Sequence, residues 1–435
     1  VGSVATLAPL AFPEGFLLAH FSRRGFLGTS FSGLTALSLG SSGLFAVAAD
    51  DQQSDAVGSS KAIGPDTLVL TWQRDPTTTM TVQWLAAADE GASAVQFQAV
   101  DGQVWQTAKA ASKPFPKTKL QIKRCELTGL QPGTEYRFQI DGRTPGYRFR
   151  TMPAKLTDEF RFVSGGDAGV GSHAVSSNVI AARQDPHFVF IGGDLAYDNG
   201  RSPETFVKFL QNYSRTMVDS AGRLIPLVSC LGNHEVDGGY NAPREAATSY
   251  LPFFDGFYAE KTFGVLDIGD YLSLVLLDTG HVASIEGEQT DWLAQTLAAR
   301  QECPHLIVAG HVPCYPSFRS PESGAKQREN WCPLFERYKV DLVLEHHDHT
   351  FKRTFPLTDG RYDKHGVLYL GDGSWGKLRA PKPPEERPYL AKTSEAYHVS
   401  VHQLQGDQRF HVALEDTGKI ADITSTASKR PSKRG

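Results

Sequence analysis

The chain has 435 residues, which allows roughly three domains at about 150 residues each. Hydrophobic residues make up 40% and charged residues 21%, and the formal net charge is -4, which together exclude wholesale disorder and argue against nucleic-acid binding by positive charge. No run of about 18 apolar residues exists, and the five cysteines are scattered, which excludes a multi-span membrane protein and a disulfide scaffold.

The first 48 residues have the features of an export signal. The run Ser22–Leu27 contains paired arginines and precedes a mildly apolar stretch, and Ala46–Ala48 forms a small-residue cleavage site, so the segment resembles a twin-arginine signal. A membrane anchor is the alternative, but interspersed Gly, Ser and Thr make the stretch weakly apolar. We therefore expect a periplasmic or secreted protein with no membrane span after signal removal, followed by a polar linker at residues 49–63.

Residues 64–152 show the period of two that half-buried strands produce. Apolar residues alternate with polar ones in five short runs: Met80, Val82 and Trp84; Val95 and Phe97; Leu120 and Ile122; Tyr136, Phe138 and Ile140; Tyr147 and Phe149. We expect an antiparallel β-sandwich that positions its neighbour and performs no chemistry. The segment before Tyr136 resembles a corner of fibronectin type III domains, in which the Tyr136 hydroxyl would tie the turn.

Residues 153–416 alternate short apolar runs with helical patterns, which indicates a layered α/β domain. Amphipathic spacing predicts helices over residues 203–217 and 331–338. Five apolar runs end in residues that can bind metals: Gly166-Asp167; Gly193-Asp194 with Tyr197; Gly232-Asn233-His234-Glu235; Gly310-His311; and His346-His347-Asp348-His349. Because polar groups gather beyond the carboxyl ends of parallel strands, we expect these five strand ends to converge on one edge.

Each of these residues has an ordinary structural interpretation when it is taken alone. Asp167 and Asp194 are acceptable helix caps, Asn233 is a common turn residue, and a single histidine is often a buried polar group. Their occurrence together favours a metal site instead. Hard oxygen ligands mixed with imidazoles suit iron, manganese or zinc, and one carboxylate can bridge two cations in a hydrolytic site.

The order and spacing of these residues resemble a known family. The blocks Asp167-x-Gly169, Gly193-Asp194-x-x-Tyr197, Gly232-Asn233-His234-Glu235, Val308-x-x-His311 and His347-x-His349 resemble the five motif blocks of calcineurin-like metallophosphoesterases. A tyrosine three residues after the second aspartate, with a fibronectin-like N-terminal domain, narrows the resemblance to purple acid phosphatases over residues 64–416. One position departs from the family pattern, because His346 stands where the family has glycine.

The resemblance implies a layered α/β/β/α catalytic domain with two metal ions. It assigns Asp167, Asp194, Tyr197 and His349 to the first metal, and Asp194, Asn233, His311 and His347 to the second. A phenol ligand favours Fe³⁺ at the Tyr197 site, and the neutral Asn233 favours divalent iron, zinc or manganese at the other. The implied reaction is hydrolysis of small phosphomonoesters by a metal-bound hydroxide, with His234 as the residue that protonates the leaving group.

Further residues are weaker candidates. Asp278 follows the apolar run Leu272–Leu277 and would brace the ligand loops, whereas Glu235 and Asp348 would orient imidazoles from outside. His346 would restrict the backbone or add a polar group. Three residues that follow ligands, Tyr315, Arg319 and Lys352, are candidates for contact with the phosphate or the leaving group.

Two alternatives to a phosphomonoesterase stay open at this stage. The motif blocks bind a phosphoryl group without defining its substituent, so a phosphodiesterase or nucleotidase fits them as well. A non-catalytic surface module would not need seven side chains of these types. The final residues 417–435 are polar and are predicted to be a disordered tail, and the sequence does not define an oligomeric state.

Overall fold

The computed structural model describes residues 65–143 and 146–430. The predicted signal at residues 1–48 and the linker at 49–63 lie outside the described residues. In the described part of the chain, no helix combines the length and the apolar character needed to cross a bilayer.

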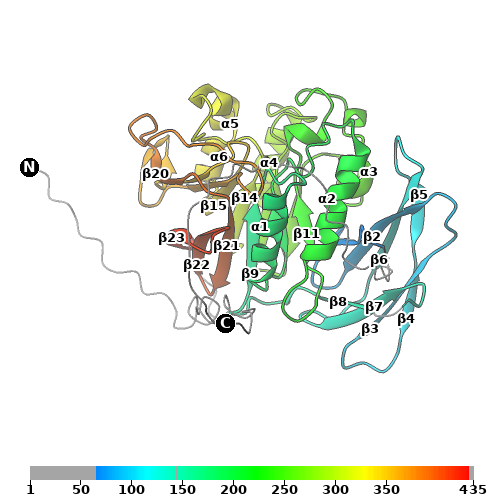
Figure 1. Ribbon diagram of the computed structural model, residues 1–435. Coiled ribbons are helices and arrows are strands. Elements are labelled where there is room, and N and C mark those ends of the chain that lie inside the picture. Colours follow the sequence, from blue (N-terminus) through cyan, green and yellow to red (C-terminus); the bar gives the residue numbers. More distant parts are fainter. Residues whose placement is uncertain (1–64, 144–145, 431–435) are drawn as a thin grey trace, which may run out of the picture. The chain divides into compact units, whose positions relative to one another are not determined.

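The N-terminal module consists of two four-stranded antiparallel sheets (Figure 1). The first sheet has the order β1 (Val69–Thr71), β2 (Met80–Ala87), β6 (Leu120–Leu127) and β5 (Ala111–Pro114). The second has the order β4 (Gln106–Lys109), β3 (Ala94–Ala99), β7 (Glu135–Ile140) and β8 (Tyr147–Arg150). The predicted alternation is confirmed, because its apolar positions Val82, Trp84, Phe138 and Phe149 are at most 1% exposed.

The tyrosine corner that the sequence suggested is present at the start of β7. The Tyr136 hydroxyl accepts a hydrogen bond of 2.8 Å from the backbone N–H of Gln131. Gly133, at the turn between them, has φ 61°, a left-handed conformation that glycine adopts without steric cost.

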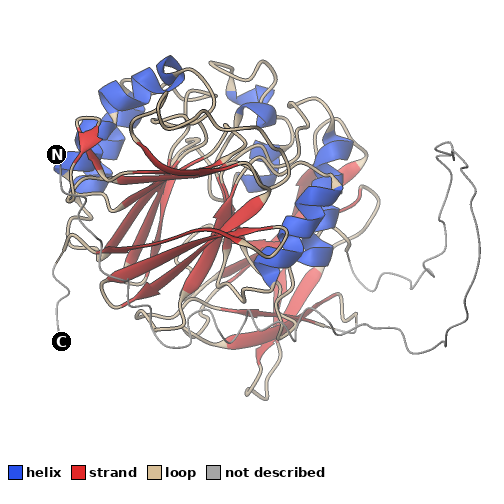
Figure 2. Cartoon of the chain, turned by 60° about the vertical axis from the view of Figure 1, so that its left-hand side comes forward, coloured by secondary structure: helices blue, strands red, loops and turns tan. Residues whose placement is uncertain are grey.

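The second domain stacks two mixed sheets between helices, which is the expected α/β/β/α arrangement (Figure 2). The six-stranded sheet has the order β11 (Leu227–Ser229), β10 (Val189–Ile191), β9 (Arg161–Gly165), β21 (His398–Gln405), β22 (Gln408–Glu415) and β23 (Ile420–Ala427). The seven-stranded sheet has the order β12 (Gly264–Ile268), β13 (Leu272–Leu276), β14 (His305–Ala309), β15 (Leu342–Glu345), β19 (Leu368–Asp372), β16 (Phe351–Thr354) and β20 (Leu390–Ser394).

Parallel pairing brings the ligand-bearing strands into register within each sheet. Strands β9, β10 and β11 are parallel neighbours in one sheet, and β13, β14, β15 and β19 are parallel neighbours in the other. The five strand ends therefore come from two facing sheets, as the implied α/β/β/α arrangement requires, and they converge as expected. A short hairpin of β17 (Leu357–Thr358) and β18 (Arg361–Tyr362) lies outside both sheets.

Helices cover the outer faces of the two sheets. On the first face lie α1 (Ser172–Ala182) and α2 (Pro203–Thr216); the remaining helices are α3 (Tyr250–Phe254), α4 (Glu288–Ala298), α5 (Ala325–Asn330) and α6 (Cys332–Arg337). The predicted helical stripe in α2 is confirmed, since Phe206, Phe209 and Tyr213 are all buried. The core against the second sheet includes Leu293 of α4 and Phe335 of α6, packed with side chains of β13, β14 and β15.

The tail prediction was wrong for the residues up to Arg430. Strand β23 pairs with β22 from Ile420 to Ala427, because its four β-branched residues favour a strand once a neighbouring edge is available. Beyond the strand, Arg430 forms an ion pair of 2.8 Å with the buried carboxylate of Asp341. The chain therefore stays attached to the catalytic domain through residue 430.

The N-terminal module contacts the catalytic domain close to a ligand loop. Arg124 of β6 donates to Asp255 at 2.7 Å and to the Phe253 carbonyl oxygen at 2.6 Å. Lys117 donates to the carbonyl oxygen of Gly200 at 3.2 Å, three residues after Tyr197. These contacts fit the predicted positioning role of the module.

Candidate metal centre

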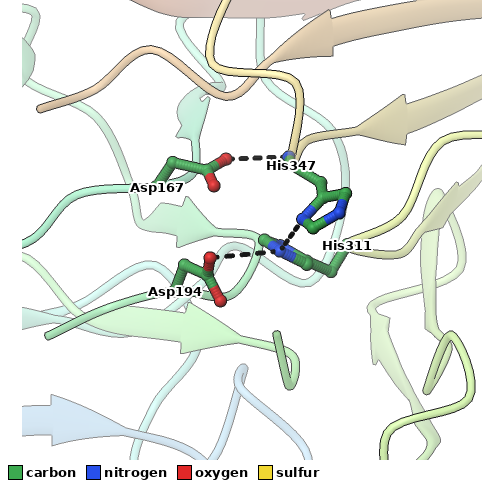
Figure 3. A group of neighbouring side chains, drawn as sticks. All are labelled: Asp167, Asp194, His311 and His347. Atoms are coloured by element: carbon green, nitrogen blue, oxygen red, sulfur yellow. Dashed lines mark hydrogen bonds and ion pairs between the residues drawn. The ribbon is translucent and has the colours of Figure 1, made fainter. Parts of the chain in front are cut away.

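Four predicted ligands meet at the edge where the two sheets face each other (Figure 3). Asp167 follows β9 and Asp194 follows β10, whereas His311 follows β14 and His347 follows β15. One ligand atom from each of these buried residues lies within 4.8 Å of all the others. Two carboxylates and two imidazoles are thus gathered in one place, which is a donor set that suits a transition metal.

Asp167 is the centre of one half of the site. Its Oδ1 accepts a hydrogen bond from the Tyr197 hydroxyl at 3.2 Å and lies 3.0 Å from Nε2 of His349. The hydroxyl of Tyr197 is in turn 3.1 Å from the same imidazole nitrogen. The second oxygen of Asp167 accepts the backbone N–H of His347 at 2.8 Å, and this bond fixes the carboxylate.

Asp194 is the centre of the other half. Among residues 65–143 and 146–430, no group donates a hydrogen bond of standard geometry to its buried Oδ2, which lies 3.4 Å from Nε2 of His311. That nitrogen is also 3.3 Å from Oδ1 of Asn233 and 3.1 Å from Nδ1 of His347. An orphaned carboxylate oxygen among nitrogen and oxygen donors fits a bound cation, since a buried charge needs a partner. All seven predicted ligands are therefore together at this edge.

The backbone at the ligands is unusual. Asp167, Asp194, Tyr197, His347 and His349 have φ between 54° and 71°, in the left-handed region that non-glycine residues rarely adopt. Such strain persists only where the surrounding structure over-determines it, and it concentrates at functional sites. The conformation of these turns therefore marks this edge as a candidate functional site.

The charges of the site shift the pKa values of its members. Burial lowers the pKa of His311, but the carboxylates of Asp194 and Asp167 outweigh it and raise this pKa to about 9. Burial and Asp167 raise the pKa of Tyr197 well above its usual value. The tyrosine therefore needs a strongly Lewis-acidic cation to bind as a phenolate.

His234 differs from the ligands because its side chain is 34% exposed. Its ring centroid lies 4.2 Å from that of Tyr197, and its Nε2 is 3.9 Å from Oδ2 of Asp194. Its Nδ1 is hydrogen-bonded to the side-chain oxygen of Asn199, which fixes the orientation of the ring. His234 is therefore the histidine of this group that solvent and a substrate can reach most easily.

Comparison with known proteins identifies the family. Residues 65–158 match the family described as purple acid phosphatase, N-terminal domain, and residues 166–351 match the calcineurin-like phosphoesterase family. The two matches together span more than half of the chain. The chain belongs to the purple acid phosphatases of the calcineurin-like superfamily. It is accordingly a metal-dependent phosphoesterase.

Individual relatives are distant. Purple acid phosphatase 21 of Arabidopsis thaliana is 24% identical over 330 residues, covering 72% of this chain and 73% of the relative. Acid phosphatase type 7 of Mus musculus is 24% identical over 406 residues, covering 83% and 90%. The solved purple acid phosphatase PPD1 from yellow lupin (Lupinus luteus) seeds has the same fold, with a TM-score of 0.69, 18% identity and coverage of 83% and 74%.

Glu235 and Asp348 were expected to orient imidazoles. In this purple acid phosphatase they accept hydrogen bonds from backbone N–H groups instead. Glu235 accepts three backbone hydrogen bonds of 2.7 Å, from Gly232, Asp194 and Leu195, and so fixes the loop of the bridging candidate. Burial and the charge of Asp194 raise the pKa of Glu235 to about 8. Asp348 accepts the backbone N–H groups of residues 317 and 318, at 2.6 and 2.8 Å.

Asp278 holds the loop at residues 280–283, which carries none of the seven predicted ligands, and His346 packs between the sheets. Asp278 accepts backbone N–H groups of residues 280 to 283, of which the shortest bond is 2.7 Å from His281. His346 is 1% exposed and packs against two glycines: a Cβ added at Gly192 would overlap its Cδ2, and one at Gly166 would lie 2.7 Å from its Cγ. His346 therefore fills space between the two sheets.

Of the three weaker candidates, only Arg319 lies beside the metal ligands. It donates to the carbonyl oxygen of His347 and lies 3.3 Å from Oδ1 of Asp348. Tyr315 is 4% exposed, and Lys352 is buried in an ion pair with Glu345, so neither is placed to meet a phosphate.

Three residues that the sequence did not suggest also reach the site. The hydroxyl of Tyr240 is 3.3 Å from Nε2 of His347, and Asn199 binds the ring of His234. The ammonium group of Lys377 lies 4.4 Å from the ring centroid of Tyr197. Only Asn199 carried a signal, because it is two residues from a predicted ligand.

Proposed function

We propose that the chain is a dinuclear metal-dependent acid phosphatase that hydrolyses small phosphomonoesters. The observation that carries the proposal is the grouping of seven candidate ligand residues, Asp194 among them, beside the partly exposed imidazole of His234. A metal pair would be chemically appropriate here because the donors form two groups, one with Asp167 and one with Asp194.

The donor chemistry supports a different metal in each half of the site. Asp167, Tyr197 and His349 would hold a trivalent iron together with Asp194, because the Tyr197 phenol binds only where a strong Lewis acid replaces its proton. Asn233, His311 and His347 would hold a divalent iron, zinc or manganese, since the neutral amide adds no negative charge.

The reaction needs an acid for the leaving group and a clamp for the phosphate. When bound, the metal pair would lower the pKa of water and withdraw charge from the phosphoryl oxygens. The water oxygen forms a new bond to phosphorus and releases its proton to solvent as the ester P–O bond breaks, and the imidazolium form of His234 donates the proton that the leaving alkoxide takes. Oδ1 of Asn199 accepts from Nδ1 of His234, so Nε2 carries a proton to transfer only in this imidazolium form. Burial lowers the pKa of His234, so the imidazolium form requires an acid pH.

The metal assignment is tested by the visible spectrum and by metal analysis of the purified protein. We expect a phenolate-to-iron band that Tyr197→Phe abolishes and that Tyr362→Phe, at an exposed tyrosine of β18, leaves in place. A colourless, iron-free and active protein would exclude iron at this position. Faster turnover of diesters than of monoesters would replace the phosphatase assignment by that of a phosphodiesterase.

The role of His234 is tested separately. Removing a general acid lowers turnover by about 10² to 10⁴-fold, so His234→Ala should reduce kcat by that amount while metal content stays at the wild-type level. Unchanged turnover with full metal content removes His234 from the reaction.

We also propose export through the twin-arginine route to the periplasm or outside the cell. The proposal is supported by the paired Arg23 and Arg24 and by the small residues Ala46–Ala48. Fusion of residues 1–63 to a reporter that is active only after folding in the cytoplasm tests it, because replacement of both arginines by lysine should abolish export.

A further inference from the structure

A cavity of about 420 Å³ opens beside the metal ligand candidate His347. Three segments enclose it: Tyr240 and Asn241, the loop from Thr279 to Glu286, and Glu322 to Gln327 at the start of α5. Its volume is within the range of small-molecule pockets, about 300 to 1,000 Å³. A larger cavity of about 680 Å³ lies beside Asp341 and is lined by none of the seven ligand candidates.

The cavity is continuous with the reaction centre through Tyr240. The hydroxyl of Tyr240 is 3.3 Å from Nε2 of His347, and both residues line the cavity. A phosphate held at the metal ligands would therefore direct its substituent into this space. The cavity is thus placed to receive the alcohol part of the ester.

The charge of the cavity is acidic. Its carboxylates are Glu286 and Glu322, and its lysine is Lys326. The ammonium group of Lys326 is engaged at 2.8 Å by Glu286, which leaves the negative charge of Glu322 in excess. Additional phosphate groups on a substrate would meet this excess charge and be repelled.

The remaining polar groups suit hydroxyls. Asn241, Ser284 and Ser323 line the wall with neutral donors and acceptors. Gln327, which is 2% exposed, has a side-chain oxygen without a hydrogen-bond partner in residues 65–143 and 146–430. A site whose polar groups await partners favours substrates that carry matching hydroxyls over those that lack them.

From the cavity, its charge and its unpaired acceptor, we infer that this phosphatase acts on monoesters of small neutral polyols, such as a hexose or glycerol phosphate, and discriminates against polyphosphorylated substrates. The inference rests on the proposed function, because it assigns the leaving group of the same site. Glu322 is then a specificity residue that acts by repulsion, and Asn241 and Gln327 bind hydroxyls of the leaving group.

The test compares kcat/KM for glucose 6-phosphate, glycerol 3-phosphate, inositol hexakisphosphate and ATP, with p-nitrophenyl phosphate as the reference. Wild type should prefer the two polyol phosphates. Glu322→Gln should raise the ratio of kcat/KM for inositol hexakisphosphate to that for glucose 6-phosphate by roughly five-fold, the effect of one charge at about 4 Å in water. Glu286→Gln should raise the same ratio, because it releases Lys326.

The matched control is Glu329→Gln, which removes an exposed carboxylate from α5, the helix that follows Glu322, at a position that does not line the cavity. The inference is overturned if wild type prefers inositol hexakisphosphate or ATP, if Glu322→Gln changes all substrates equally, or if Glu329→Gln gives the same change. If the protein still hydrolyses p-nitrophenyl phosphate when one of these outcomes is found, only the inference fails, and the proposed phosphatase function stands.

A binding measurement covers the case in which no phosphomonoester is hydrolysed and the proposed function fails. Calorimetric titration of the metal-loaded chain with glucose 6-phosphate and inositol hexakisphosphate needs no turnover. The inference is supported if wild type binds glucose 6-phosphate more tightly than inositol hexakisphosphate, and if Glu322→Gln increases the affinity for inositol hexakisphosphate. Tighter binding of the polyanion to wild type overturns it.

Discussion

Replacing His346 by glycine should destabilise the fold without removing a metal. The imidazole is 1% exposed and occupies the space above the bare Cα atoms of Gly166 and Gly192. Emptying a buried site of this kind costs about 2–4 kcal/mol, and glycine adds about 0.5–1 kcal/mol of backbone entropy. The expected total of about 2.5–5 kcal/mol corresponds to a loss of roughly 5–10 °C in Tm, at about 2 °C per kcal/mol for a large domain.

The assay combines scanning calorimetry with metal analysis on the same preparation. His346→Gly should lower Tm while metal content stays at the wild-type level, and His346→Ala should lower Tm by a smaller amount. Loss of metal without a change in Tm would show that the imidazole is a ligand. An unchanged Tm with full metal content would refute the packing argument itself.

Three further outcomes follow from buried or bridging groups. Glu235→Gln places an amide NH₂ against one of the three backbone N–H groups that the carboxylate accepts, so metal affinity measured by competition with a chelator should fall about ten-fold or more; unchanged affinity would contradict this role. Arg124→Ala removes the 2.7 Å pair with Asp255, which is partly exposed, so the loss of stability measured by calorimetry should be only about 1 kcal/mol, and a loss of several kcal/mol would contradict it. Burial lowers the pKa of His305 from 6.5 to about 4. Between pH 6.5 and 4, His305 therefore binds a proton in the unfolded chain but not in the folded chain. The free energy of unfolding falls as the pH falls through this range, by about 3 kcal/mol in full. His305→Gln should flatten the dependence of Tm on pH in that window, and an equally steep curve would refute the assignment.

The ligand set was predictable because its signal is local. Each block of candidate ligands comes shortly after an apolar run, and the ends of parallel strands must lie at the same edge of a sheet. Asp167 and Asp194 follow neighbouring strands of one sheet, and His311 and His347 follow neighbouring strands of the other. The residue pattern alone did not assign these strands to two sheets, because an apolar run does not indicate which sheet its strand joins.

Residues that act across loops had no such signal. Tyr240 and Lys377 reach the site from segments with no motif of their own, and their positions depend on how those segments are anchored. The segment that carries Lys377 is held by the N–H of Gly376, which donates to the Asp167 carbonyl oxygen, and by that of Arg379, which donates to the His349 carbonyl oxygen. Strand β23 was missed for a related reason, since a polar strand is stable only beside a partner edge.

The strained ligand turns explain why the site needs both sheets. A non-glycine residue in a sparsely populated conformation costs of the order of 1–3 kcal/mol, so each turn requires compensation from its neighbours. That compensation runs between loops: the N–H of Asp167 donates to the Gly193 carbonyl oxygen at 3.1 Å, within one sheet. Between the sheets, the N–H of His347 donates to Oδ2 of Asp167 at 2.8 Å.

These bonds set the ligand positions through the protein itself. The His346 imidazole lies at the same junction, against Gly192 of one sheet. The backbone N–H of His346 donates to the His311 carbonyl oxygen of the other sheet at 2.9 Å. A side chain at position 346 is accommodated because the opposite sheet presents a glycine there. The departure from the family pattern is thus matched by Gly192, against which the His346 side chain packs.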